Sequence, residues 1–159
     1  MKPVVSVIMG SISDKEVMSK AFEILDSFNV AYEKKVMSAH RTPEEVASFS
    51  KNAINNGIKV IIAGAGGAAH LPGVIASMTV LPVIGVPILG KSTAGLDSLL
   101  SIVQMPSGIP VATVGINGSA NAALLAVEVL AVNDISLQKR LVEYREKIKK
   151  LSLESNKGL

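Results

Sequence analysis

The feature that most constrains the fold is a regular alternation of short apolar runs with longer segments that carry helix signals. The apolar runs are rich in β-branched residues and have the length of buried strands. Repeated strand–helix alternation predicts a doubly wound parallel sheet, with right-handed crossovers that place helices on both faces. The expected strands are residues 4–9, 30–37, 58–63, 82–86 and 111–114. The expected helices are residues 14–28, 43–55, 70–79, 95–102 and 121–132, and a last one that begins near residue 133.

The composition is aliphatic, as such a sheet requires. Hydrophobic residues make up 48% of the 159 residues and aromatic residues only 3%, so Val, Ile, Leu and Ala must form the core. Continuous aliphatic strands are typical of parallel sheets buried on both faces. The length is that of one domain, and we expect a single three-layer α/β/α domain over residues 1–159. Cysteine is absent, which excludes disulfides, thiolate metal sites and cysteine nucleophiles.

The last expected helix has an apolar seam. Leu137, Leu141, Tyr144, Ile148 and Leu151 follow one another at alternating steps of four and three residues. Such a seam needs a partner, either the sheet or a neighbouring subunit, and we expect residues 133–159 to pack on a neighbouring subunit. Lysines and arginines alternate there with glutamates, and the one aromatic residue of the segment, Tyr144, belongs to the apolar seam. This pattern indicates a solvated helix face and no nucleic-acid surface.

No targeting or membrane segment is expected. Lys2 precedes only a short apolar run of strand length, so the sequence lacks the pattern of a secretory leader. Residues 71–90 carry no charge and are long enough to span a bilayer, but prolines and glycines divide them into helix, turn and strand. We therefore expect a cytoplasmic protein that does not bind a membrane.

Two helix starts show capping signals. Thr42 and Glu45 have the spacing of a capping box, with Pro43 at the first helical position. Ser13 and Glu16 have the same spacing before the first helix. Each start follows an expected strand directly, so both loops lie at the carboxyl edge of the sheet, where open α/β sheets bind ligands.

Polar side chains concentrate in these two loops. Helix N-termini attract anions, and Arg41 adds a cation suited to bidentate binding of phosphate or carboxylate. Ser11, Ser13 and Ser38 supply hydroxyl groups, while Asp14 would repel phosphate but accept hydrogen bonds from sugar hydroxyls. This set suits a ribose phosphate, although Ser13, Asp14 and Thr42 would also serve simply as helix caps.

Residues 64–69 match the dinucleotide-binding glycine pattern after a strand and before a helix. The acidic residue that this pattern needs about 20 positions later is missing, because no Asp or Glu occurs between Val46 and Leu96. Nicotinamide and flavin cofactors are therefore not expected. A loop with so few side chains lets its backbone approach a flat ligand, and it also permits tight helix–strand packing.

The chain has only two histidines, His40 and His70. Histidine titrates near neutral pH, and the position of His40 beside Arg41 at the end of a strand favours a role in proton transfer. His70 opens a helix and would serve as a cap or a supporting group. Two histidines without a neighbouring carboxylate or thiol make a poor metal site, and no serine has the setting of an acyl-transfer nucleophile.

Long motifs in one order carry a family resemblance over nearly the whole chain. Together they resemble the 5-(carboxyamino)imidazole ribonucleotide mutase family of bacterial purine biosynthesis. The resemblance implies a flavodoxin-like sheet and a homo-octamer with active sites at subunit contacts. Residues 88–93 and 116–120 depart from the family pattern, which leaves the rim of the site unassigned. The motifs are residues 9–14, 38–43, 63–73, 97–106 and 121–126.

The resemblance also implies roles for individual residues. His40 is the expected proton shuttle, Ser11, Asp14 and Arg41 bind the ribose phosphate, and residues 65–71 enclose the imidazole and the migrating carboxyl group. The full expected set is catalytic His40 with substrate-binding Ser11, Ser13, Asp14, Ser38, Ala39, Arg41, Ala65, Gly66, Gly67, Ala68, His70 and Leu71.

The implied reaction moves a carboxyl group from the exocyclic amine to ring carbon 4, giving 4-carboxy-5-aminoimidazole ribonucleotide. It proceeds by decarboxylation, trapped carbon dioxide and a histidine proton shuttle, without a metal or other cofactor. One alternative is a related branch that carboxylates aminoimidazole ribonucleotide directly. That branch has lysine at the position of Arg41 and lacks the segment at residues 69–71, which favours the mutase. A second alternative is a non-catalytic module that binds a phosphorylated ligand.

Overall fold

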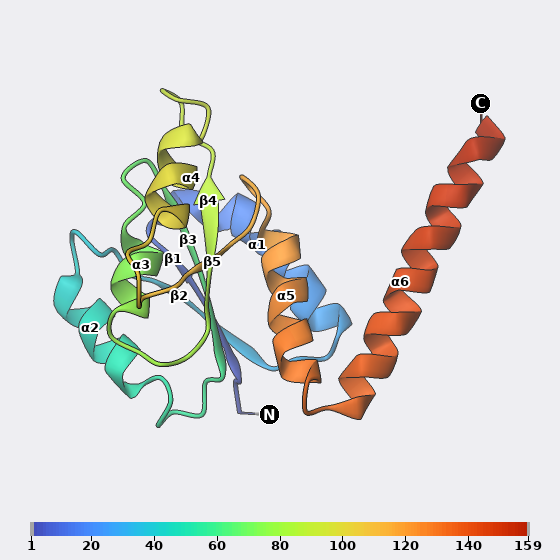
Figure 1. The fold of residues 1–159 in the computed structure, drawn as a ribbon, viewed down its shortest axis with the longest axis horizontal. Helices are drawn as coiled ribbons and strands as arrows, with labels where there is room; N and C mark the ends of the chain where they lie inside the picture. Colours follow the sequence, from blue (N-terminus) through green and yellow to red (C-terminus); the bar gives the residue numbers. More distant parts are fainter. Residues whose placement is uncertain (1, 159) are drawn as a thin grey trace.

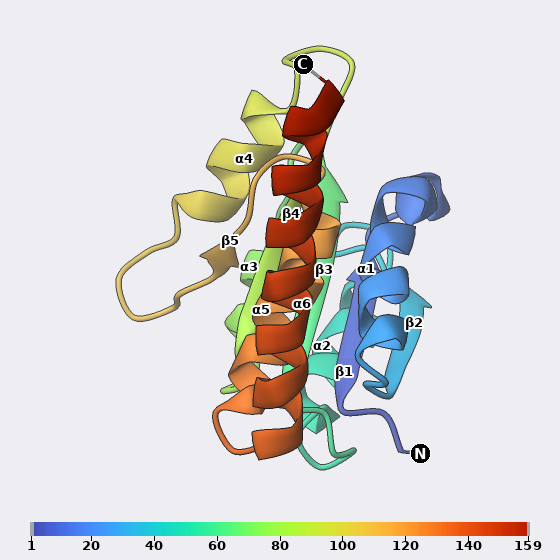
Figure 2. The same cartoon turned by 90° about the vertical axis from the view of Figure 1, so that its right-hand side faces the viewer.

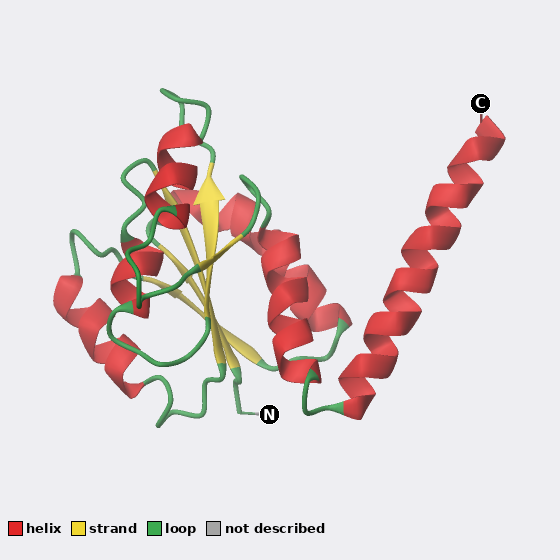
Figure 3. Cartoon of the chain, in the orientation of Figure 1, coloured by secondary structure: helices red, strands yellow, loops and turns green. Residues whose placement is uncertain are grey.

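The fold is a five-stranded parallel sheet between two layers of helices, as the sequence predicts (Figures 1 and 3). The computed structural model describes residues 2–158. The strand order is β2-β1-β3-β4-β5, and all neighbouring pairs are parallel. The flavodoxin-like, doubly wound architecture is therefore confirmed. The strands are β1 (Val5–Met9), β2 (Tyr32–Val36), β3 (Val60–Gly66), β4 (Val83–Ile88) and β5 (Ala112–Thr113).

The helices divide between the two faces of the sheet (Figure 1). Helices α2, α3 and α4 cover one face, and α1 and α5 cover the other. Their bounds are α1 (Lys15–Ser27), α2 (Pro43–Asn52), α3 (Leu71–Ala76), α4 (Leu96–Val103), α5 (Ser119–Ala131) and α6 (Ile135–Ser155), with short 3-10 turns at Ile12–Asp14 and Asn156–Gly158.

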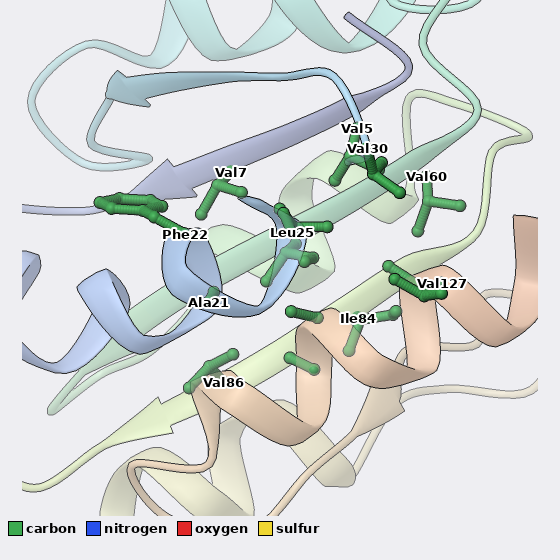
Figure 4. Packing of buried hydrophobic residues seen from close by; sticks show 14 of the residues in the cluster. Val5, Val7, Ala21, Phe22, Leu25, Val30, Val60, Ile84, Val86 and Val127 are labelled. Atoms are coloured by element: carbon green, nitrogen blue, oxygen red, sulfur yellow. The ribbon is translucent and has the colours of Figure 1, made fainter. Parts of the chain in front are cut away.

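Two aliphatic cores form because side chains along each strand alternate between the faces. In β1, Val5 and Val7 point to the α1 and α5 side, whereas Ile8 points to the α2 and α3 side. Figure 4 shows Val5 and Val7 packed with Leu25 of α1 and Val127 of α5. The two layers hold the sheet on both sides, so that only the strand ends are left to build a site.

The N-terminal half of α6 packs on the domain. Asp134 caps the helix by accepting a hydrogen bond from the backbone N–H of Leu137 at 3.0 Å. Leu137 is buried, and the Tyr144 ring lies 5.5 Å from the Phe28 ring. Arg140 donates a hydrogen bond to the Phe28 carbonyl at 2.6 Å.

The C-terminal half of α6 leaves the domain (Figures 1 and 2). Ile148 is 46% exposed and Leu151 is 56% exposed, although both belong to the same apolar seam as Leu137. Both views place the end of α6 past the carboxyl ends of the strands, close to the level of the loop between β4 and α4. Within this chain, only the N-terminal half of the predicted apolar seam packs against other residues.

Neither predicted capping box forms. Thr42 precedes α2 but makes no side-chain cap, because its hydroxyl bonds to Ser38 instead. At the first helix Ser11, and not Ser13, accepts the capping hydrogen bond, since a 3-10 turn precedes α1. Pro43 does stand at the start of α2, as predicted. Both capping boxes fail for the same reason: the hydroxyl groups of Ser13 and Thr42 bond to nearby serine residues and not to the backbone N–H groups of the helix start.

Some predicted bounds of strands and helices are also wrong. β3 continues to Gly66, so the first part of the predicted glycine loop is strand, paired with β4 as far as Gly66 and Ile88. α3 ends at Ala76, short of the predicted residue 79. Within residues 2–158, none of the helices is both long and apolar enough to cross a membrane.

Gly85 of β4 provides a test of the core. A Cβ atom there would overlap Ile102 Cγ2 and lie 3.0 Å from Val111 Cγ1. We expect Gly85→Ala to lower the free energy of unfolding by about 1–3 kcal/mol, measured by urea denaturation, because overpacking displaces neighbouring side chains. Gly115→Ala is the control, since nothing lies within 4 Å of a Cβ at Gly115. Equal stability of the two variants would contradict the packing described here.

Candidate active site

A cavity of about 380 Å³ lies at the carboxyl edge of the sheet, where the loops after β1, β2 and β3 meet. Every residue of the predicted site lies in its wall. The three loops are adjacent because β1 stands between β2 and β3 in the sheet. The predicted residues in the wall are Ser11, Ser13, Asp14, Ser38, Ala39, His40, Arg41, Ala65, Gly66, Gly67, Ala68, His70 and Leu71.

The loop after β1 combines hydroxyl groups with one buried carboxyl. Ser11 Oγ accepts hydrogen bonds from the Ser13 backbone N–H at 3.3 Å and from the Ser13 hydroxyl at 2.9 Å. Asp14 is only 9% exposed. Burial raises the pKa of the Asp14 carboxyl above its ordinary value of 3.8, while hydrogen bonds from Ser11 and Ser13 and the charge of Arg41 oppose that rise.

The loop after β2 is held by Ser38 and Thr42. The Ser38 backbone N–H donates to Thr42 Oγ1 at 2.9 Å, and the Thr42 hydroxyl donates to the Ser38 carbonyl at 3.1 Å. Ser38 Oγ accepts from the backbone N–H of Arg41 at 3.2 Å and from its Nε at 3.4 Å. These hydrogen bonds hold the turn that carries the side chains of His40 and Arg41.

Arg41 joins the first two loops. Its guanidinium lies 3.5 Å from the carbonyl oxygen of Gly10, the residue that follows β1. No carboxylate among residues 2–158 forms an ion pair with Arg41. A cation that borders a cavity beside two serine hydroxyls is suited to bind an anion such as a phosphate group.

His40 and His70 are in direct contact. His40 Nε2 lies 2.8 Å from His70 Nδ1, and the ring centroids are 4.9 Å apart with planes at 78°. His70 directly precedes α3, but its side chain does not cap that helix. The sequence suggested that His70 is either a helix cap or a supporting group. The structure agrees with the second role and not with the first. The sequence offered no signal for the pair, because the residues are 30 positions apart.

The wall of the cavity formed by the end of β3 and the loop after it has almost no side chains. The Gly10 backbone N–H donates to the Gly64 carbonyl at 3.0 Å, which joins the loop after β1 to β3. Gly67 has a φ of 62°, a conformation that glycine adopts without strain, and nothing lies within 4 Å of where its Cβ would be. The backbone of this wall is thus accessible to a flat ligand.

Sequence reasoning missed part of the rim. Gly10, Ile88, Leu89 and Gly90 also line the cavity. Ile88 is the last residue of β4, which neighbours β3, and Leu89 and Gly90 follow it. The Leu89 backbone N–H donates to Asn117 Oδ1 at 2.9 Å. The strand order would have indicated them, but the predicted strand ended two residues too early, at residue 86.

The residues of the cavity offer no metal centre. Within the described part of the chain, no group of three or more His, Cys, Asp or Glu side chains is arranged to hold a metal ion. The chemistry available in the wall is therefore hydrogen bonding, one guanidinium charge, one buried carboxyl and a pair of imidazoles.

The fold and the cavity define a flavodoxin-like α/β protein with a ligand site at the carboxyl edge of its sheet. The sequence profile of the AIR carboxylase family matches residues 4–151, and the chain belongs to this family. The chain is 60% identical to the N5-carboxyaminoimidazole ribonucleotide mutase of Pyrococcus abyssi over 148 residues, which cover 93% of this chain and 85% of that protein.

Two further proteins extend the comparison. The N5-carboxyaminoimidazole ribonucleotide mutase of Bacillus subtilis is 56% identical, and the match covers 100% of this chain and 99% of that one. The crystal structure of Treponema denticola PurE has a TM-score of 0.89 and 31% identity, covering 99% of this chain and 98% of that chain. The similarity thus extends over the whole domain, α6 included.

The buried carboxyl leads to a prediction about stability. Because the pKa of Asp14 is raised on folding, the folded state binds its proton more tightly than the unfolded chain. Its stabilising contribution is complete below the ordinary value of 3.8 and is lost as the pH rises through the raised pKa. We expect Asp14→Asn to unfold at higher urea concentration than the parent protein at pH 7, with a difference that shrinks as the pH is lowered. A difference that grows toward acid pH would contradict this assignment.

Proposed function

We propose that this chain is an enzyme of purine biosynthesis, a 5-(carboxyamino)imidazole ribonucleotide mutase. It moves the carboxyl group from the exocyclic amine to ring carbon 4 of the same ribonucleotide. The observation that carries the proposal is that one cavity combines an anion-binding end, a wall without side chains and a histidine. The mutase names of the relatives support the same reaction.

The anion-binding end suits the ribose phosphate. Ser11, Ser13 and Ser38 offer hydroxyl groups to phosphate oxygens, and Arg41 offers a charged, planar donor. Asp14 repels phosphate but accepts hydrogen bonds from ribose hydroxyls. The sugar, which joins the phosphate to the ring, therefore lies on the side of the cavity where Asp14 is. The substrate is therefore oriented by its phosphate, with the imidazole directed to the opposite wall.

The other end suits the imidazole and the migrating group. Ala65, Gly66, Gly67 and Ala68 present backbone and small side chains to a flat ring, with Ala39 and Leu71 beside them. The carbon–nitrogen bond of the carbamate breaks to give carbon dioxide and the free amine. Carbon 4 then attacks the retained carbon dioxide, and the new carbon–carbon bond forms. Confinement supplies the proximity that this recombination needs.

His40 moves the proton that completes the reaction. Once carbon 4 has bonded to carbon dioxide, it must lose its hydrogen to restore the aromatic ring. His40 takes that proton, which replaces the proton that the amine nitrogen took up when the carbamate released carbon dioxide, so that atoms and charge balance within one turnover. The reaction is an isomerisation and consumes no second substrate.

The function is tested by supplying each candidate substrate with and without bicarbonate. A mutase converts 5-(carboxyamino)imidazole ribonucleotide without added bicarbonate, and it retains a carbon-13 label in the carboxyl group when unlabelled bicarbonate is present. A direct carboxylase requires aminoimidazole ribonucleotide with carbon dioxide and incorporates the unlabelled carbon. A phosphorylated-ligand sensor binds a ribonucleotide and converts neither compound. Either of the last two results overturns the proposal.

The proposed enzyme is a cytoplasmic homo-octamer with active sites at subunit contacts. The exposed apolar side chains of the outer half of α6, including Ile148 and Leu151, support an assembly in which residues 133–159 pack on a neighbouring subunit. The outer half of α6 stands at the same end of the domain as the cavity (Figures 1 and 2), which supports its packing close to a site. A phosphorylated substrate does not cross membranes freely, which supports the cytoplasmic location.

A further inference from the structure

β4 extends beyond its outer neighbour in the sheet. β5 contains only Ala112–Thr113, which pair with Ile84 and Gly85. β4 continues past Gly85 to Ile88, and on its inner side it stays paired with β3 as far as Ile88. Residues 88–90, which we call the β4 rim, line the cavity. On its outer side, the β4 rim therefore needs partners other than a strand.

Asn117 supplies these partners from the turn between β5 and α5. Its backbone N–H donates to the Pro87 carbonyl at 2.8 Å, and its side-chain Oδ1 accepts from the Leu89 backbone N–H at 2.9 Å. In a parallel pair, a strand residue makes the equivalent two bonds with its own backbone N–H and C=O. Asn117 thus pairs with the chain around Ile88 as a strand residue would, with its side-chain amide in place of its carbonyl.

The conformation of the turn frees the side chain of Asn117 for this role. The Gly118 backbone N–H donates to the Gly115 carbonyl at 2.8 Å, which closes a tight turn over residues 115–118. Asn117 has a φ of 58° in that turn, a conformation that asparagine adopts more readily than most residues. The backbone turns toward α5 there, and the side-chain oxygen is the group that meets Leu89.

Ser98 of α4 holds the other polar group of the same peptide. Its hydroxyl lies 2.8 Å from the Ile88 carbonyl oxygen and 2.9 Å from the Gly95 carbonyl oxygen, and the residue is 0% exposed. The peptide group that joins Ile88 to Leu89 is therefore bound at its C=O by one side chain and at its N–H by another. Neither Ser98 nor Asn117 lines the cavity, so this N–H is engaged by the protein and is not free to bind water or substrate.

The β4 rim borders the wall to which the proposed function assigns the migrating group. A Cβ atom at Gly66 would lie 3.5 Å from both the Cβ and the carbonyl oxygen of Ile88, so the rim packs directly on the backbone of that wall. Carbon dioxide is small and neutral, so no charged group can hold it, and only a closed, dry wall keeps it beside the ring. A rim with a fixed peptide meets that need.

We propose that Asn117 is a positioning residue, which fixes the β4 rim through Leu89 and so keeps carbon dioxide in the cavity between its release and its recapture. The proposal rests on the proposed function for this consequence, whereas the fixed rim is independent of any reaction. When carbon dioxide escapes, the carbon–nitrogen bond has broken, the amine nitrogen has taken up a proton, and aminoimidazole ribonucleotide remains. The share of this compound among the products measures the leak.

Two substitutions of Asn117 separate the hydrogen bond from the backbone conformation. Asn117→Gly removes the acceptor and adopts a positive φ without strain, whereas Asn117→Asp keeps an oxygen acceptor and tolerates the same φ. We expect Asn117→Gly to raise the share of aminoimidazole ribonucleotide about 3- to 10-fold, the equivalent of one net hydrogen bond, with little change in KM. We expect Asn117→Asp to stay within about twofold of the parent protein. Both values are corrected for spontaneous loss of carbon dioxide without protein.

The β4 rim is also measured without any substrate. Hydrogen–deuterium exchange of the Leu89 amide, resolved by mass spectrometry, should be about 3- to 10-fold faster in Asn117→Gly and parent-like in Asn117→Asp. Asn29→Gly is the matched control, because Asn29 also has a positive φ, of 50°, and lies at the opposite edge of the sheet, between α1 and β2. We expect Asn29→Gly to leave both the Leu89 exchange and the product share unchanged.

The outcomes separate this proposal from the proposed function. Parent-like exchange of the Leu89 amide in Asn117→Gly overturns the positioning role, whether or not the protein is a mutase. Faster exchange with an unchanged product share, or an equal leak in Asn117→Gly and Asn117→Asp, overturns the link to carbon dioxide and leaves the mutase assignment intact. Parent protein that converts none of the candidate substrates overturns the mutase assignment, and the exchange measurement still decides whether Asn117 fixes the rim.

Discussion

His40→Asn is expected to lower turnover by about 10²- to 10⁴-fold, the usual contribution of a positioned general acid–base group. Asparagine retains a hydrogen-bonding group of similar reach but cannot take up a proton near neutral pH. The proposed phosphate end of the cavity, which Ser11, Ser38 and Arg41 line, is unchanged by the substitution. Binding of the ribonucleotide product, measured by calorimetry, is therefore expected to stay within about threefold of the parent value, less than 1 kcal/mol.

The matched control is Glu44→Gln, which removes an ionisable group four positions away on the exposed side of α2. Glu44 does not line the cavity, so its substitution should leave both kcat and binding as they are. Near-normal turnover in His40→Asn would remove the proton-shuttle assignment. Loss of binding in that variant would show instead that His40 chiefly holds the substrate.

The second large effect concerns assembly. We expect Ile148→Asp combined with Leu151→Asp to convert the proposed oligomer into smaller species, observed by light scattering at micromolar concentration. Both side chains are about half exposed in the single chain, so placing carboxylates there costs the isolated domain little. Buried against a neighbour, the same two carboxylates would be unpaired charges in an apolar contact, which is strongly unfavourable.

A charge-matched control separates assembly from electrostatics. Lys150→Asp changes the net charge by the same amount as the double substitution, at an exposed position outside the apolar seam. We expect it to assemble normally. An unchanged mass for the double variant would mean that the outer half of α6 faces solvent in the oligomer as well.

The parts of the fold that follow from hydrophobic patterns and from the position of proline were predicted correctly. Aliphatic runs become strands, Pro43 begins a helix, and the ends of three strands meet at one site. The hydroxyl partners of Ser11 and Thr42 were not predicted, because several acceptors compete within a few residues and the sequence does not rank them.

The parts that depend on distant contacts were not predicted. The imidazole pair requires that the loops after β2 and β3 meet above β1, which follows only from the strand order. Likewise the seam of α6 indicates that a partner is needed, but its division between Leu137, which packs on this chain, and Leu151, which does not, depends on the angle at which the helix leaves α5.

In the proposed enzyme, the buried carboxyl of Asp14 would link folding to ligand binding thermodynamically. Above its raised pKa the Asp14 carboxylate lies in a poorly hydrated position, which lowers the stability of the protein without ligand. A sugar whose hydroxyls donate to the carboxylate supplies the missing solvation, so that the loaded form resists unfolding more than the empty form.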